Sequence, residues 1–123
     1  MLHLASTRSQ STLSQFDSDQ VQPNAIDLRV DKIFQSFSQV FIISEDEKQH
    51  RKSAPVELDD HGWYRLEPGS YEIIMEGTVS IGDDEAGWVI TRSSLNRNGC
   101  FITSGLYDSG YEGVMAGVLH VNN

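Results

Sequence analysis

The sequence is poor in cysteine, in positive charge and in long apolar runs, and each scarcity excludes a class of protein. A single cysteine, Cys100, can form neither an internal disulfide nor a cysteine-rich zinc site. No apolar run reaches the roughly 18 residues that a membrane helix requires, and the first residues lack the apolar stretch of a signal peptide. We therefore expect a small cytoplasmic domain of 123 residues with no membrane contact.

Positive charge is scarce as well. Lysine and arginine together number 9, against 18 aspartates and glutamates, so the formal net charge is −9 at pH 7. Such a chain is a poor candidate for binding a nucleic-acid backbone, which requires a basic face. The acidity is concentrated in residues 45–87, whereas residues 88–123 carry no net charge. If the chain binds an anionic small molecule, we expect the binding site in the last third of the chain.

Strand patterns run through most of the chain after a polar N-terminal arm. Residues 1–22 are rich in serine, glutamine and aspartate, and we expect one helical turn there at 12–16. Residues 45–62 predict a long exposed loop. Short apolar or alternating segments predict strands at residues 25–30, 40–43, 63–66, 71–75, 78–81, 88–91, 100–103 and 114–121. Six or more short strands with glycine-rich turns predict an all-β barrel or sandwich.

Three clusters of polar residues are candidates for function. In the first, Asp27 and Arg29 alternate with apolar Ile26 and Leu28, so both charges face one side of the expected strand. This pattern is compatible with a functional site and equally with a solvent-facing ion pair.

The second cluster, residues 91–99, follows a predicted strand and contains Arg92, Ser93, Ser94 and Arg97. Guanidinium groups, hydroxyls and backbone amides in such a loop can bind phosphate, which is the interpretation we favour. The alternative is a polar turn with a helix beginning at one of the two serines.

The third cluster, residues 105–113, has three glycines and predicts a tight hairpin whose backbone approaches a ligand closely. Asp108 can act as a general base for water, and Tyr111 offers a flat surface to a sugar or base. The alternative is a β-turn in which Asp108 hydrogen-bonds only its own backbone.

The remaining residues that could bind a metal, a nucleotide or a partner are weaker evidence for function. The four histidines are scattered without ligand spacing, so we expect no transition-metal site built by the protein. No phosphate-binding P-loop and no dinucleotide motif occurs. Cys100 is expected in the core, and Trp63 and Trp88 in the core or an interface.

The three clusters, in this order and at this spacing, resemble the motifs of the dUTPase and dCTP deaminase superfamily over about residues 21–123. The matching segments are VQPNAIDLR at 21–29, LEPGSY at 66–71, RSSLNRNG at 92–99 and GLYDSGYEG at 105–113, the last with Tyr107 in place of the usual aliphatic residue. The resemblance implies a distorted β-barrel, the dUTPase-like β-clip, with an arm at 1–22 and a β domain at 23–123. The family continues with a further strand region and a glycine-rich arm, so we expect either a domain truncated at its C-terminus or a minimal member.

The resemblance also implies roles for the clustered residues. Arg92, Ser93 and Ser94 would contact the triphosphate of dUTP or dCTP together with Mg²⁺, at a site between the subunits of a homotrimer. Asp108 would position the attacking water or bind the 3′-hydroxyl. Tyr111 would pack under the deoxyribose and disfavour a 2′-hydroxyl.

Further roles follow from the same resemblance. Hairpin backbone groups, including that of Gly105, would read the pyrimidine edge. Arg97 falls where the deaminases carry a second catalytic arginine. Asp27, with Arg29 beside it, would act at greater distance, through structure or a metal-bound water, and no residue is implied as a direct metal ligand.

The strand after the hairpin bears on the choice between the two branches. Deaminases need a glutamate there, whereas residues 114–123 contain no acid, and the aligned position is Val118 or His120. Hydrolysis between the α- and β-phosphates needs only a positioned water, cationic support and a metal. We therefore expect an enzyme that hydrolyses dUTP to dUMP and pyrophosphate. A dCTP deaminase that uses His120, and a non-catalytic nucleotide-binding member, are the alternatives.

Overall fold

The computed structural model describes residues 8–123, so residues 1–7 of the expected arm lie outside the described part. The described chain is nearly all β, as predicted, with one short helix. In chain order the elements are β1 (Thr12–Leu13), η1 (Ser18–Gln20), β2 (Val30–Ser36), β3 (Ile42–Ile43), β4 (Lys48–Gln49), β5 (Ser53–Pro55), β6 (Gly69–Met75), β7 (Val79–Ser80), α2 (Ser93–Arg97), β8 (Cys100–Thr103), β9 (Glu112–Gly113) and β10 (Ala116–Val121).

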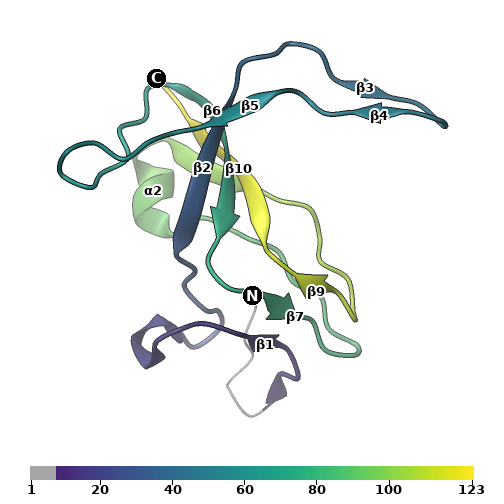
Figure 1. Cartoon of the computed structure of the whole chain (residues 1–123). Coiled ribbons are helices and arrows are strands. Elements are labelled where there is room, and N and C mark those ends of the chain that lie inside the picture. Colours follow the sequence, from purple (N-terminus) through teal and green to yellow (C-terminus); the bar gives the residue numbers. More distant parts are fainter. Residues whose placement is uncertain (1–7) are drawn as a thin grey trace.

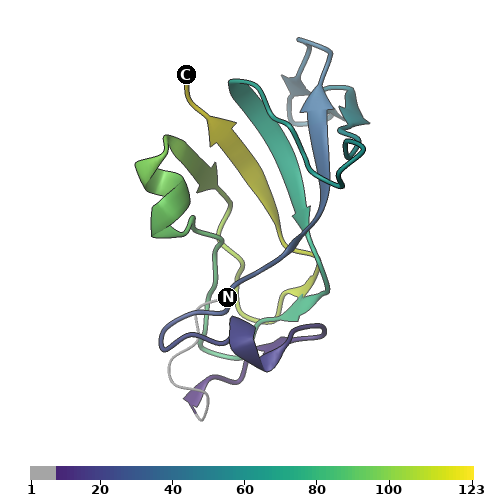
Figure 2. The ribbon, with the colours of Figure 1, turned by 90° about the vertical axis from the view of Figure 1, so that its left-hand side faces the viewer.

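The largest sheet has five antiparallel strands in the order β5-β2-β6-β10-β8. A smaller sheet, β1-β7-β9, follows beyond one end of β6, and the β3–β4 hairpin projects from the body (Figure 1). Figure 2 shows the larger sheet from the side, with α2 standing next to β8. Across the described residues these sheets do not close into a barrel, and the arrangement is that of a distorted β-clip.

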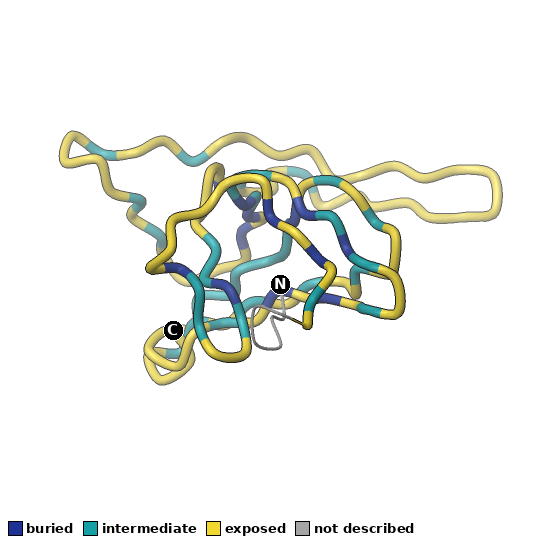
Figure 3. The backbone as a smooth tube through the Cα atoms, turned by 90° about the horizontal axis from the view of Figure 1, so that it is seen from below, coloured by how far each residue is buried: buried dark blue, intermediate teal, exposed yellow. Residues whose placement is uncertain are grey.

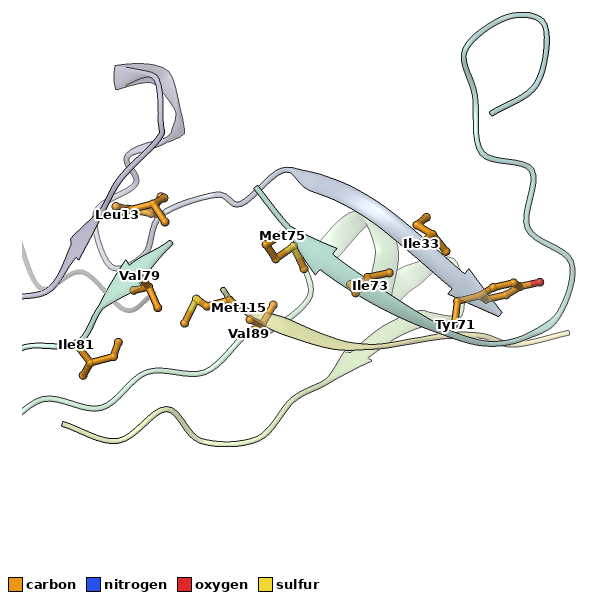
Figure 4. Close-up of a cluster of buried hydrophobic side chains, with 10 residues drawn as sticks. Leu13, Ile33, Tyr71, Ile73, Met75, Val79, Ile81, Val89 and Met115 are labelled. Atoms are coloured by element: carbon orange, nitrogen blue, oxygen red, sulfur yellow. The ribbon is translucent and has the colours of Figure 1, made fainter. Parts of the chain in front are cut away.

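Alternate residues of β6 build the centre of the core. Tyr71, Ile73 and Met75 are buried, while Glu72 between them is exposed, as the two-residue repeat of a strand requires. The other buried apolar residues are Leu13, Ile26, Ile33, Val79, Ile81, Val89 and Met115 (Figure 4). This cluster joins the two sheets. Figure 3 shows that the buried residues lie at the centre of the molecule, whereas the long loops that extend from it are exposed.

The N-terminal arm makes more tertiary contacts than its polar composition indicated. Thr12 and Leu13 pair with β7, and Leu13 is buried. The helical turn expected at 12–16 is therefore wrong, and the turn lies later, in η1. Burial of the Leu13 side chain against the core favours the extended conformation at this position.

The strand expected at 25–30 is also wrong, because this segment supplies only a bridge between Val21 and Ile26 and β2 begins at Val30. In place of strand pairing, two hydrogen bonds with Gln20 fix the backbone of Asp27. The Asp27 N–H donates to the Gln20 carbonyl oxygen at 2.8 Å, and Gln20 Nε2 donates to the Asp27 carbonyl oxygen at 2.7 Å.

The strand expected at 63–66 is an irregular segment closed by Asp59. Asp59 Oδ1 accepts the Trp63 N–H at 2.9 Å, and Arg65 Nε lies 2.6 Å from Asp59 Oδ2. These contacts, with the Trp63 N–H first, lower the pKa of the Asp59 carboxyl. Trp63 is 66% exposed and lies outside the core. Residues 45–62, expected to be a loop, contain β4 and β5.

The segment 88–91 runs alongside β8 but forms no regular strand. The Ser104 hydroxyl accepts the Val89 N–H at 2.9 Å, and the Thr91 hydroxyl accepts the Ile102 N–H at 2.6 Å. Side-chain acceptors thus replace the backbone hydrogen bonds of the strand that was predicted at 88–91. Trp88 is 44% exposed, and Cys100 is only half-buried, so neither lies in the core.

Candidate active site

The RSSLNRNG segment forms a short helix with its polar groups exposed. Arg92 precedes α2 in an extended conformation, and its carbonyl oxygen accepts two N–H groups of the first turn. Gly99 has φ +76°, a left-handed conformation that suits the residue after a helix. The helical alternative is therefore the local structure. Ser93, Ser94 and Arg97 nevertheless keep their side chains exposed and accessible to an anion.

The first and second sequence clusters meet in the fold. Arg92 Nη1 lies 3.4 Å from Asp27 Oδ2, and Gln22 Nε2 donates to the same oxygen at 3.2 Å. Arg29 does not share this contact, because it pairs with Asp17 at 2.9 Å. The Arg92 side chain is 74% exposed and that of Asp27 only 26%. An exposed pair of this kind contributes little stability, so the Arg92 guanidinium stays available to a phosphate.

An apolar pocket of about 300 Å³ opens beside this pair. We call it the Asp27–Arg92 pocket. Those two residues are the only charged ones that line it. Its remaining lining is Ala25, Ile26, Leu28, Val30, Met75, Trp88, Val89, Ile90, Thr91, Leu95 and Ile102. The pocket thus combines an apolar wall with one exposed guanidinium at its rim.

The hairpin cluster carries an exposed carboxylate. The Tyr111 N–H donates to the Asp108 carbonyl oxygen at 3.1 Å, and Gly110 between them has φ +81°, as a tight turn requires. The Asp108 carboxylate has no hydrogen-bond partner among the described residues, so the alternative in which it binds only its own backbone is not observed. The carboxylate is free to orient a water molecule.

Tyr111 folds back onto its own hairpin. Its hydroxyl donates to the Val114 carbonyl oxygen at 2.7 Å, and its ring lies 4.9 Å from that of Tyr107, centroid to centroid. A Cβ on Gly113 would come within 2.8 Å of the Tyr111 hydroxyl, so glycine is required there while the ring stays in place. The ring is half-buried, which leaves part of its surface to a ligand.

A partly exposed cluster of polar contacts around Glu85 connects the arm to this hairpin, and sequence reasoning missed it. The Glu85 carboxylate accepts from the hydroxyls of Ser9 and Ser11 and from the Gln10 N–H. Ser11 first, then Gln10 and Ser9, lower the pKa of Glu85 to about 2. The Ser109 hydroxyl donates to the Glu85 carbonyl oxygen at 2.6 Å. In sequence Glu85 is one acid among several in a glycine-bounded loop, and nothing distinguishes it.

A second hollow, of about 430 Å³, lies between the end of β8 and the start of β10. We call it the β8–β10 pocket. It is lined by Glu72, Thr103, Ser104, Gly105, Ala116, Gly117 and Val118. Gly105, expected to approach a ligand, therefore sits at a concave surface. Sequence reasoning missed Glu72, because its place in β6 is that of an ordinary solvent-facing residue.

His120 is held next to this pocket but does not line it. Its Nδ1 lies 3.0 Å from the Ser70 hydroxyl, and its Nε2 lies 2.9 Å from the Thr103 hydroxyl. The ring stacks on Phe101 at 4.8 Å. Both ring nitrogens are thus engaged by hydroxyls of the two neighbouring strands, whereas Val118 lines the pocket directly.

The candidate residues do not all converge within one chain. Asp27 and Arg92 meet at one pocket and Gly105 lines the other, whereas Asp108 lines neither. Figure 1 shows α2 beside the larger sheet and β9, which follows the Asp108 turn, near β7. Within residues 8–123 no group of three or more histidine, cysteine or acidic side chains is arranged to hold a metal ion. The described helices are also too short and polar to cross a membrane.

A family model described as dCTP deaminase-like matches residues 2–123. The chain belongs to this family, within the dUTPase and dCTP deaminase superfamily. The match covers all four motif segments, the all-β fold and both pockets.

Several curated relatives are similar over most of the chain. A Halobacterium salinarum protein named "Probable deoxyuridine 5'-triphosphate nucleotidohydrolase" is 33% identical over 110 residues, which cover 85% of this chain and 66% of the relative. A protein of the same name from Aeropyrum pernix is 33% identical over 103 residues, covering 84% and 64%. A Salinispora tropica protein named "dCTP deaminase, dUMP-forming" is 35% identical over 108 residues, covering 82% and 55%. The chain thus spans just under two thirds of the length of the first of these relatives and less of the others.

Proposed function

We propose that this chain hydrolyses dUTP to dUMP and pyrophosphate, at sites formed between the subunits of a cytoplasmic homotrimer. The observation that carries the proposal is the exposed Arg92 guanidinium, held by Asp27 next to the hydroxyls of Ser93 and Ser94. The names of the Halobacterium and Aeropyrum relatives support the substrate.

In this reaction water attacks the α-phosphorus, the bond from that phosphorus to the bridging oxygen breaks, and pyrophosphate leaves. The Asp108 carboxylate orients the water and accepts its proton. Arg92 and the exposed Arg97 balance negative charge on the phosphates, and the two serine hydroxyls donate to phosphate oxygens. The exposed part of the Tyr111 ring supports the sugar.

Magnesium is part of the proposal as an ion that arrives with the triphosphate. Magnesium commonly binds through one or two carboxylates together with substrate phosphates. Asp27 would act on the ion at a distance, through a metal-bound water, and the ion would neutralise phosphate charge.

A trimer would complete the site. Arg92 lines one pocket and Asp108 lines neither, so we infer a common site made from the hairpin of one subunit and α2 of another. Exposed apolar side chains near these elements, Trp88, Ile90 and Leu106, support an assembly that covers them.

Product analysis tests the activity. The chain is incubated with dUTP or dCTP in magnesium, and nucleotides are separated by anion-exchange chromatography. Formation of dUMP and pyrophosphate from dUTP is expected, and an unchanged dUTP pool would contradict the proposal. Conversion of dCTP identifies the second candidate, deamination, which the Salinispora relative and the place of Arg97 favour.

Subunit mixing tests the shared site. R92A and D108N are each expected to be inactive, whereas co-expressed mixtures regain part of the activity because some interfaces combine an intact Arg92 with an intact Asp108. Mixtures no more active than the separate variants would show that one chain supplies both groups.

A further inference from the structure

Glu72 is the one ionisable residue that lines the β8–β10 pocket. It lies on β6 opposite Val118 of β10 and opposite Phe34 of β2. Since Tyr71 and Ile73 on either side face the core, the Glu72 side chain faces the opposite side of the sheet, where the pocket opens. Directly opposed residues have Cβ atoms about 5 Å apart, so the Glu72 carboxylate reaches the surface that Val118 lines.

The other polar side chains of the pocket already have partners. The Ser104 hydroxyl accepts from the Val89 N–H and lies 3.0 Å from the Gly105 carbonyl oxygen. The Thr103 hydroxyl is engaged by His120. Among residues 8–123, the Glu72 carboxylate has neither a hydrogen bond nor an ion pair.

One backbone donor of the pocket is also unused. Gly105 N–H has no partner in the described chain, and a Cβ added to Gly105 would meet no atom within 4 Å. The lining residues therefore include a carboxylate acceptor of full negative charge and a backbone donor, neither of which has a partner in the described chain. The edge of a pyrimidine ring carries a matching pair, an N–H beside a carbonyl oxygen in uracil or an amino group beside a ring nitrogen in cytosine.

We propose that Glu72 contributes to base recognition by accepting a hydrogen bond from an N–H on the pyrimidine edge of the nucleotide, a donor that both uracil and cytosine present. An ionised carboxylate only accepts, so it selects a base edge that presents a donor. The strand that follows the hairpin has no acid of its own, and the neighbouring strand β6 supplies one at the same surface. This inference rests on the proposed nucleotide substrate and adds the residue that reads its base.

The test pairs protein variants with ligands that lack the N–H. Dissociation constants are measured by calorimetry for α,β-imido-dUTP and its N3-methyl derivative, and for dCTP and its N4,N4-dimethyl derivative. The proteins are the unchanged chain, E72M, E72Q and the control E57Q, which makes the same charge change at an exposed site outside the pocket. Methionine matches glutamate in size but cannot replace its acceptor, so a purely steric effect of the added methyl groups would persist in E72M.

The unchanged chain and E57Q are expected to bind the parent nucleotide about tenfold or more tightly than its methylated form, and E72M is expected to lose most of this preference. E72Q, which keeps a neutral acceptor, is expected to lie between them. An E72M chain that binds the parent nucleotide and keeps the full preference would overturn the inference and leave the proposed function standing. Failure of the unchanged chain to bind either parent nucleotide would overturn both.

Discussion

The Tyr107 hydroxyl binds both backbone groups of Ala116, donating to the carbonyl oxygen at 2.9 Å and accepting from the N–H at 2.7 Å. Ala116 begins β10 and lines the β8–β10 pocket. An aliphatic side chain, usual at this point of the motif, cannot make either bond. Tyr107 thus uses its hydroxyl to fix the strand from which the pocket is built.

Replacing this hydroxyl should weaken the fold. Tyr107→Phe leaves two partly buried backbone groups without a partner, which is expected to lower the free energy of unfolding by about 1–3 kcal/mol. Denaturant unfolding measures the change. Tyr64→Phe is the matched control, because the Tyr64 hydroxyl makes only one long contact, 3.4 Å, at an exposed site. Equal losses in both variants would contradict this role of Tyr107.

Gly117 allows β10 and β8 to approach each other. A Cβ at this position would lie 2.8 Å from the Thr103 carbonyl oxygen and 3.1 Å from Ile102 Cγ2. Gly117→Ala is therefore expected to cost about 1–3 kcal/mol of stability, because backbone must shift. Gly105→Ala, at the same pocket but facing open space, is expected to be close to neutral. Thermal melts of the two variants should separate them clearly.

Glu85 should make the stability of the fold depend on pH. Its folded-state pKa of about 2 lies below the ordinary value of 4.5, so its contribution is complete above pH 4.5 and is lost as the pH falls toward 2. Glu85→Gln is expected to melt below the unchanged chain at pH 7, with the difference shrinking between pH 4.5 and 2. A difference that stays constant over this range would exclude ionisation of Glu85 as the cause.

A substitution at Asp108 should greatly slow turnover of the nucleotide without weakening its binding. Asp108→Asn keeps the size of the side chain but removes the group that takes a proton from water, so hydrolysis of dUTP is expected to fall by a factor of about 100 or more. Binding of α,β-imido-dUTP should change little, because Asp108 does not hold the phosphates in the proposed site. Hydrolysis at the unchanged rate would refute the proposed role, and Asp83→Asn, in an exposed loop, is the control.

His120 should distinguish hydrolysis from deamination. Its nitrogens are engaged by Ser70 and Thr103, and its side chain does not line the pocket. His120→Ala is therefore expected to leave dUTP hydrolysis within about twofold of the unchanged chain. If the chain converts dCTP and this variant does not, while its melting temperature is unchanged, His120 moves a proton in that reaction.

Part of the architecture was predictable from residue patterns. A strand at 71–75 was predicted from its apolar residues, and the structure has it within β6, where Tyr71, Ile73 and Met75 are buried because successive strand residues point to opposite sides. Strands were also predicted at the short segments 88–91 and 63–66, and both are absent. In these segments the Ser104 hydroxyl accepts the Val89 N–H and the Asp59 carboxylate accepts the Trp63 N–H, so neither N–H is available for pairing with a neighbouring strand.

Three features could be inferred from consecutive residues alone: the family, from the order of its motif segments, the all-β class, and the tight turn around Gly110. These features depend on local backbone preferences and on side-chain spacing, both of which are written in consecutive residues. The tertiary structure decided that Asp27 pairs with Arg92 rather than with Arg29, and that Glu72 faces a pocket formed by β8 and β10. Such partners come from distant segments, and only the folded sheet brings their side chains within hydrogen-bonding reach.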